Sequence, residues 1–174
     1  MKKWLIFLLT LCLCLSVASC GTTGGNSSEN SNNSSETTEN KKPASHVQIK
    51  GITLSLGAEF TEEDRTALGE PDDVMEAPSC HYDGSDSIYY YPGFTLYTYM
   101  SEEKAILYSI ELSDASLSTP EGIKVGMTLD EVKAQCGSDF KETETGISYA
   151  LDEGIDLNFR AEAGIVTVIE YYTE

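Results

Sequence analysis

Two segments of the chain show the same order of residue types, and this internal similarity limits the fold more than any other feature. In residues 56–69 and again in residues 125–137, a threonine followed by acidic residues begins a helical pattern, and a glycine ends it. Each segment is followed by sequence rich in residues that favour β-strands. The chain is therefore expected to contain two copies of one helix-and-strand unit.

The second copy defines its helix most clearly. Thr128 and Glu131 have the spacing of a capping box, in which the two side chains bond amides of the first turn that lack helical partners. Leu129, Val132 and Cys136 then recur on one side of the helix. We expect this apolar side to face a core.

Hairpins are expected after each helix, because short strand-like segments are separated by turns rich in Gly, Pro and Asp. Apolar and polar side chains alternate in residues 155–160, as in a strand with one buried and one exposed face. A leading strand is expected near residues 47–54. The full set of expected strands after the helices is 88–91, 94–100, 106–112, 147–151, 155–160 and 165–172.

These elements together predict an α+β fold made of two tandem repeats, each a helix plus an antiparallel meander. Repeat one covers about residues 47–117 and repeat two about residues 118–174. We expect both helices to lie on one face of an antiparallel sheet and to leave the other face open.

The string at residues 126–132, with the glycine that ends the helix and the meander that follows, resembles the repeat of the β-lactamase inhibitory protein fold. It is also similar to small lipoproteins of the outer-membrane assembly machinery. Residues 77–80, 83–86 and 118–123 resemble a group of uncharacterised Gram-positive lipoproteins. The resemblance implies binding of a partner through the open sheet face. No inhibitory loop of that family can be matched to residues of this chain.

The N-terminus predicts export and lipidation. Two lysines precede an apolar run at residues 4–15, and Val17-Ala18-Ser19 stand before Cys20. The run is shorter than the ~20 residues that a permanent membrane-spanning helix needs. Residues 1–19 are therefore expected to be a signal peptide, and the small residues before Cys20 resemble a lipobox. An ordinary signal peptide with an accidental Cys20 is the alternative.

Residues 20–46 are expected to be a lipidated, disordered tether, because residues 21–42 contain no aromatic or aliphatic side chain. The globular domain is then expected at 47–174, on the outer face of a cell membrane, as in a Gram-positive bacterium. The net charge of −18 disfavours nucleic acid and anionic lipid as partners. We expect a monomer that contacts the membrane only through its lipid and binds an unidentified envelope protein.

Two cysteines remain in the expected domain. Cys80 and Cys136 could form a disulfide outside the cell, but Cys136 lies on the apolar side of a helix, so we expect two free thiols. Cys80 is followed by His81, with Asp83 nearby. Adjacent residues of an extended chain point to opposite sides, which disfavours a nucleophile–base pair. We expect no catalytic residue and no enzyme activity.

No cofactor is expected, and no metal site. One Cys–His pair is too few ligands for zinc, and the calcium-loop pattern of alternating oxygen ligands is absent. The acidic surface could attract calcium weakly or bind a basic partner, and the sequence leaves these alternatives open.

Tyrosines give the strongest indication of function. Tyr89, Tyr91, Tyr97 and Tyr99 recur at every second position of two expected strands. Tyrosine suits both strand pairs and protein interfaces. These four residues are predicted to bind a partner, which makes the chain a binding module. A structural or stress-related envelope lipoprotein and a carboxylate-based hydrolase are the alternatives.

Overall fold

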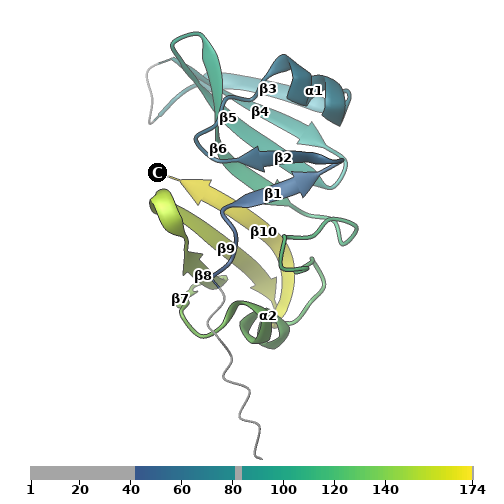
Figure 1. The fold of residues 1–174 in the computed structure, drawn as a ribbon, viewed down its shortest axis with the longest axis vertical. Helices are drawn as coiled ribbons and strands as arrows, with labels where there is room; N and C mark the ends of the chain where they lie inside the picture. Colours follow the sequence, from purple (N-terminus) through teal and green to yellow (C-terminus); the bar gives the residue numbers. More distant parts are fainter. Residues whose placement is uncertain (1–41, 81–83, 174) are drawn as a thin grey trace, which may run out of the picture. The chain divides into compact units, whose positions relative to one another are not determined.

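The computed structural model describes residues 42–80 and 84–173 (Figure 1). The predicted signal peptide (1–19), the predicted lipidation residue Cys20 and most of the predicted tether lie outside the described residues. Within the described ranges, no helix has the length and apolar composition to cross a membrane. His46, assigned by sequence to the tether, already lies in the first strand.

The fold is α+β and consists mostly of antiparallel sheet, as predicted. A two-stranded sheet precedes an eight-stranded sheet whose strand order is β3-β4-β5-β6-β10-β9-β8-β7. The first elements along the chain are β1 (His46–Ile49), β2 (Ile52–Ser55), α1 (Glu62–Leu68), β3 (Asp73–Pro78), β4 (Ser85–Tyr91), β5 (Phe94–Ser101) and β6 (Lys104–Leu112). The remaining elements are α2 (Leu129–Cys136), β7 (Lys141–Thr143), β8 (Gly146–Ala150), the 3-10 turn η1 (Asp152–Gly154), β9 (Ile155–Glu162) and β10 (Ile165–Thr173).

Both helices begin with a capping box. The Glu131 amide donates to Thr128 at 3.2 Å, and the Thr128 amide donates back to the Glu131 carboxylate at 2.7 Å. Thr61 and Asp64 make the same reciprocal pair at the start of α1. Gly137 ends α2 with a φ of 85°, a value that side chains other than glycine adopt with difficulty. The predicted helix starts and stops are confirmed.

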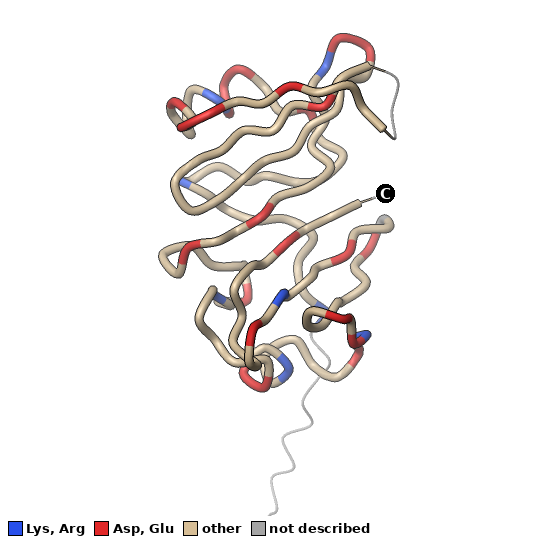
Figure 2. Tube along the Cα trace, turned by 180° about the vertical axis from the view of Figure 1, so that it is seen from behind, with Lys and Arg blue, Asp and Glu red and all other residues tan. Residues whose placement is uncertain are grey.

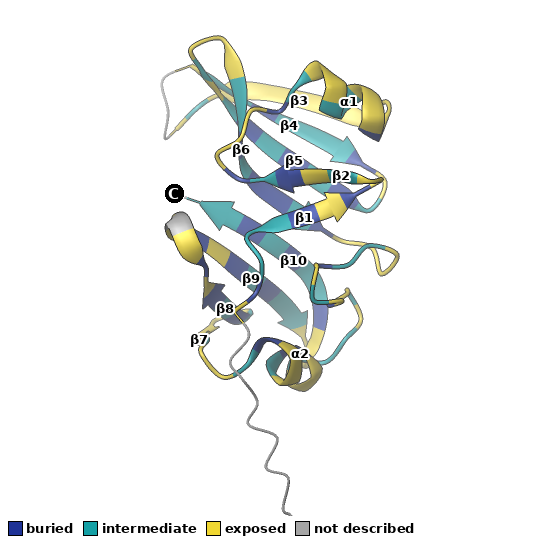
Figure 3. Cartoon of the chain, viewed as in Figure 1, coloured by how far each residue is buried: buried dark blue, intermediate teal, exposed yellow. Residues whose placement is uncertain are grey.

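The core contains residues of both helices and both sheets. Buried side chains of β1 and β2, such as Val47 and Leu54, belong to the same cluster as inward-facing residues of the large sheet (Figure 3). Val132 and Cys136 are 0% and 3% exposed, so the predicted apolar side of α2 does face this core. Each fully buried aliphatic or aromatic side chain contributes roughly 1.5–3 kcal/mol through the hydrophobic effect.

Three expectations about strands were wrong. The single leading strand near 47–54 is a hairpin, because Lys50 and Gly51 both adopt positive φ and reverse the chain between β1 and β2. β3 and β7 were not predicted: every residue of both strands is exposed, so neither carries an apolar alternation. Each helix is consequently followed by four antiparallel strands in place of three.

The two halves of the large sheet meet where β6 pairs with β10. Glu111 lies opposite Glu170 in this pairing, and Leu112 lies opposite Ile169. Cross-strand partners share a face of a sheet, so the two glutamates lie on one face and the two apolar residues on the other. We call the face that carries Glu111 and Glu170 the outer face.

Candidate partner-binding face

The four predicted tyrosines are divided between the two faces of the sheet. Tyr89 and Tyr91 pair with Leu96 and Phe94 of β5, so they lie on the core side. The Tyr91 ring stacks on Phe94 with centroids 4.6 Å apart, and only 5% of Tyr91 is exposed. Tyr91 is thus too buried to contact a partner on the outer face. Direct partner binding there remains a prediction for Tyr97 and Tyr99.

Tyr97 and Tyr99 are joined on the outer face by Tyr108, which the sequence interpretation did not include. The ring centroid of Tyr108 lies 6.0 Å from that of Tyr97 and 6.3 Å from that of Tyr99. All three side chains are half-buried. We call these residues the tyrosine cluster.

A β-bulge explains why Tyr108 was missed. Ile110 and Leu112 of β6 are buried, and strict alternation would place residue 108 with them. The pairing of β5 with β6 shifts between Tyr97 and Thr98, so that Leu107 takes the buried position instead. The shift leaves Tyr108 beside its two outer-face neighbours.

Charged residues continue the outer face from the tyrosine cluster. The hydroxyl of Tyr97 donates to a carboxylate oxygen of Glu111 at 3.0 Å. The other carboxylate oxygen of Glu111 is paired with the guanidinium of Arg160, which reaches it from β9 across β10. Burial first, and then the Glu111 charge and hydrogen bond, raise the pKa of Tyr97 far above its usual value. Tyr97 is therefore a neutral donor at physiological pH.

Glu170 is held by neutral donors from the strands on either side. The hydroxyl of Ser109 and the side-chain amide of Asn158 each donate to its carboxylate at 3.4 Å. Glu111 and Glu170 therefore both have partners, although they are like charges directly opposite each other. The arrangement offers hydroxyls, carboxylates and aromatic rings for binding.

The two cysteines lie in different surroundings: Cys80 is an exposed free thiol and Cys136 a buried one in the structure. Whether the native protein carries two free thiols stays a prediction. Burial, and then the charge of Glu121, raise the pKa of Cys136 to about 12. His81 and Asp83 lie outside the described residues.

Metal ligands do not gather in the part of the chain that the structure describes, where no group of three or more His, Cys, Asp or Glu residues could hold an ion. Acidic residues are instead spread over the chain among few basic ones (Figure 2). Comparison with protein-family models, curated proteins and solved structures finds no match to this chain. The resemblance drawn from residues 126–132 and the predicted lipoprotein identity both stay predictions.

Proposed function

We propose that the chain is a lipid-anchored extracytoplasmic binding module, without enzyme activity, that engages another envelope protein through the outer face of its large sheet. Anchoring rests on residues 1–20, where a charged start and an apolar run precede the small residues before Cys20. The acidic domain would then reach its partner on the outside of the membrane.

The proposal includes two tandem repeats with an open sheet face. In support, each half contains a capped helix followed by four antiparallel strands, and the strand order runs symmetrically outward from the β6–β10 pair. The helices and the β1–β2 hairpin contribute to one core cluster with the inward side chains of the sheet. The side chains that alternate with those buried residues form the outer face.

The tyrosine cluster is the observation that carries the proposal. Tyr97, Tyr99 and Tyr108 lie side by side, half-exposed, on central strands of the sheet. Tyrosine is enriched in protein interfaces, because a rigid apolar ring ends in a group that forms hydrogen bonds. The adjacent carboxylates of Glu111 and Glu170 would favour a partner that brings hydrogen-bond donors or cations.

A carboxylate-based hydrolase is the less favoured alternative. Glu111 and Glu170 are the opposed carboxylates that such an enzyme would use. Arg160 and Tyr97 already occupy Glu111, and Ser109 and Asn158 already occupy Glu170. Carboxylates held in this way are poorly placed to exchange protons with a substrate, which argues for binding.

Two variants compared on the same cells test the proposal. Tyr99→Ala/Tyr108→Ala removes two rings of the tyrosine cluster. The control, Ile165→Ala, removes a 40% exposed side chain at the first residue of β10, away from the part of β10 that pairs with β6. We expect the double variant to lose the protein that co-purifies with the unaltered chain after cross-linking. Ile165→Ala should retain it, and both should unfold cooperatively. Equal recovery of the co-purifying protein with both variants would show that the tyrosine cluster is not the binding site.

A further inference from the structure

Strand β3 forms one edge of the large sheet and is exposed along its whole length. It pairs with β4 alone, and its residues Val74 and Met75 are 43% and 49% exposed. The amide of Val74 donates to the Asp73 carboxylate at 2.9 Å. A strand with a neighbour on one side only leaves backbone groups unpaired along its free side and can accept a further strand.

Two pockets lie beside this edge, on the core side of the sheet. Val74 and Glu76 both face that side, because they pair with Tyr89 and Ser87 of β4. Val74 lines a pocket of about 460 Å³, and Glu76 lines a second pocket of about 470 Å³. Alternate side chains of a strand added to β3 would therefore point toward the two pockets in turn.

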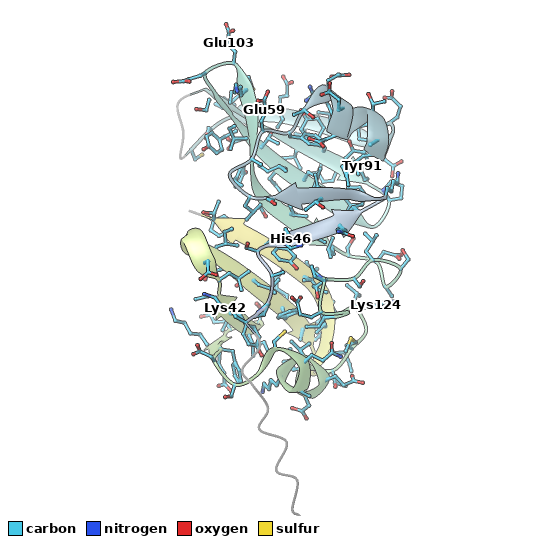
Figure 4. The ribbon with its side chains drawn as sticks, in the orientation of Figure 1. Lys42, His46, Glu59, Tyr91, Glu103 and Lys124 are labelled. Carbon is cyan, nitrogen blue, oxygen red and sulfur yellow. The ribbon has the colours of Figure 1, made fainter. Side chains whose placement is uncertain are left out.

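The first pocket combines apolar walls with an unsatisfied hydroxyl. Pro71, Val74 and Tyr89 line it near the C-terminal end of α1, where Figure 4 labels Tyr91. Tyr91 also lines this pocket, and its hydroxyl has no hydrogen-bond partner although the residue is 5% exposed. Buried polar groups are normally bonded, so this hydroxyl is a place for a ligand group.

The second pocket is strongly acidic. Figure 4 labels Glu59 and Glu103, which belong to its lining near the N-terminal end of α1. Arg65 is the one basic residue that lines either pocket, and it is already paired with Glu62 at 3.0 Å. Lys104, outside both linings, pairs with Glu59 at 3.0 Å, so two of the five acidic side chains of this lining already have a cationic partner. The acidic side chains of this lining are Glu59, Glu62, Glu63, Glu76 and Glu103. A cationic side chain is the occupant that such a pocket favours.

We propose that β3 binds an extended, cationic segment of a partner protein by strand addition. A lysine or arginine would lie next to Glu76, and an apolar side chain two positions away would lie next to Val74 and the first pocket. Asp73 and Glu76 disfavour a second copy of this chain at the edge, since paired copies would bring like charges together. The edge site does not depend on the tyrosine cluster, and either site can fail without the other.

Synthetic peptides test the edge site on the protein purified from its producing cells in mild detergent. The first peptide alternates lysine and valine on one face of an extended chain, with threonine on the other. The second has glutamate for lysine, and the third is the lysine peptide with alternate backbone amides methylated. By fluorescence anisotropy, the lysine peptide should bind at least about tenfold more tightly than either of the others.

Variants assign the binding to β3. Glu76→Lys should reverse the preference between the lysine and glutamate peptides. Glu162→Lys makes the same charge change at an exposed end of β9 and should leave the preference as it was. Tyr99→Ala/Tyr108→Ala should bind the lysine peptide normally, which separates this site from the outer face.

Several results would overturn the edge site. Equal binding of the methylated peptide would show attraction by net charge without strand addition. An equal effect of Glu162→Lys, or no binding at about 1 mM peptide, would also refute it. A dimer that the lysine peptide dissociates, seen by sedimentation, would assign the edge to a second copy.

Discussion

Replacing Arg160 by methionine should destabilise the middle of the large sheet. Arg160 pairs with Glu111, and Glu111 lies opposite Glu170 across the β6–β10 seam. The side chains of Arg160 and Glu111 are 40% and 20% exposed, so water screens this pair less than a surface pair. Methionine keeps an unbranched apolar stem and removes the guanidinium that pairs with Glu111.

The expected loss follows from the geometry. The variant loses the attraction between Arg160 and Glu111, and opposite charges about 4 Å apart attract by about 4 kcal/mol at an effective dielectric constant of ~20. Solvent around the 40% exposed Arg160 side chain and the desolvation of both groups offset most of this attraction. We expect a net loss of about 1–2 kcal/mol in the free energy of unfolding, which lowers the melting temperature by about 3–6 °C.

A double-mutant cycle with Glu111→Gln isolates the pair. Urea unfolding followed by circular dichroism should give a coupling energy of about 1–2 kcal/mol for Arg160 and Glu111. The matched control is the pair of Lys104 and Glu59, which is 3.0 Å long with side chains 58% and 41% exposed. Lys104→Met with Glu59→Gln should show a coupling of no more than about 0.5 kcal/mol.

The reasoning is refuted if the two couplings are equal within error, or if Arg160→Met is as stable as the unaltered protein. Either result would mean that the opposed glutamates are well solvated, so that the outer face is a flexible polar surface.

Three further predictions concern single side chains. Tyr149→Phe should lower the free energy of unfolding by about 1 kcal/mol, because the Tyr149 hydroxyl donates to a backbone carbonyl at the end of α2 at 2.8 Å. Tyr171→Phe removes a buried hydroxyl without a hydrogen-bond partner, so in the same urea assay it should leave the free energy of unfolding unchanged or raise it. Iodoacetamide at neutral pH should alkylate Cys80 and spare Cys136, whose pKa is raised to about 12 by burial, and mass spectrometry of the native protein would show which thiol reacts. Thr128→Ala should lower stability by about 1 kcal/mol through loss of the capping box, while Thr128→Ser should retain most of it in thermal melts.

The local elements could be predicted because their signals lie within a few residues of one another. Thr128 and Glu131 fix the start of α2, and the alternation in residues 155–160 fixes which side of β9 is buried. β3 gave no such signal, because Val74 and Met75 are adjacent and both exposed at the sheet edge. The β1–β2 turn at Lys50 and Gly51 was missed because apolar residues continue on both sides of it.

The outer face could be predicted only in part, because its composition depends on contacts between distant segments. Tyr97 and Tyr99 were found by alternation alone. Tyr108 lies beside them because of the β-bulge between β5 and β6, and no residue pattern in the sequence marks the position of this bulge. The contact between Glu111 and Arg160 depends on the pairing of β6 with β10, which joins residues far apart along the chain.

Photo-cross-linking on intact cells tests the central claim most directly. A photoreactive amino acid replaces Tyr99 in one strain and Asp130, on the exposed surface of α2, in another. The account predicts an adduct of one defined envelope protein from position 99, with little or none from position 130. Equal adducts from both positions, or none from position 99 while position 130 reacts, would contradict docking through the outer face.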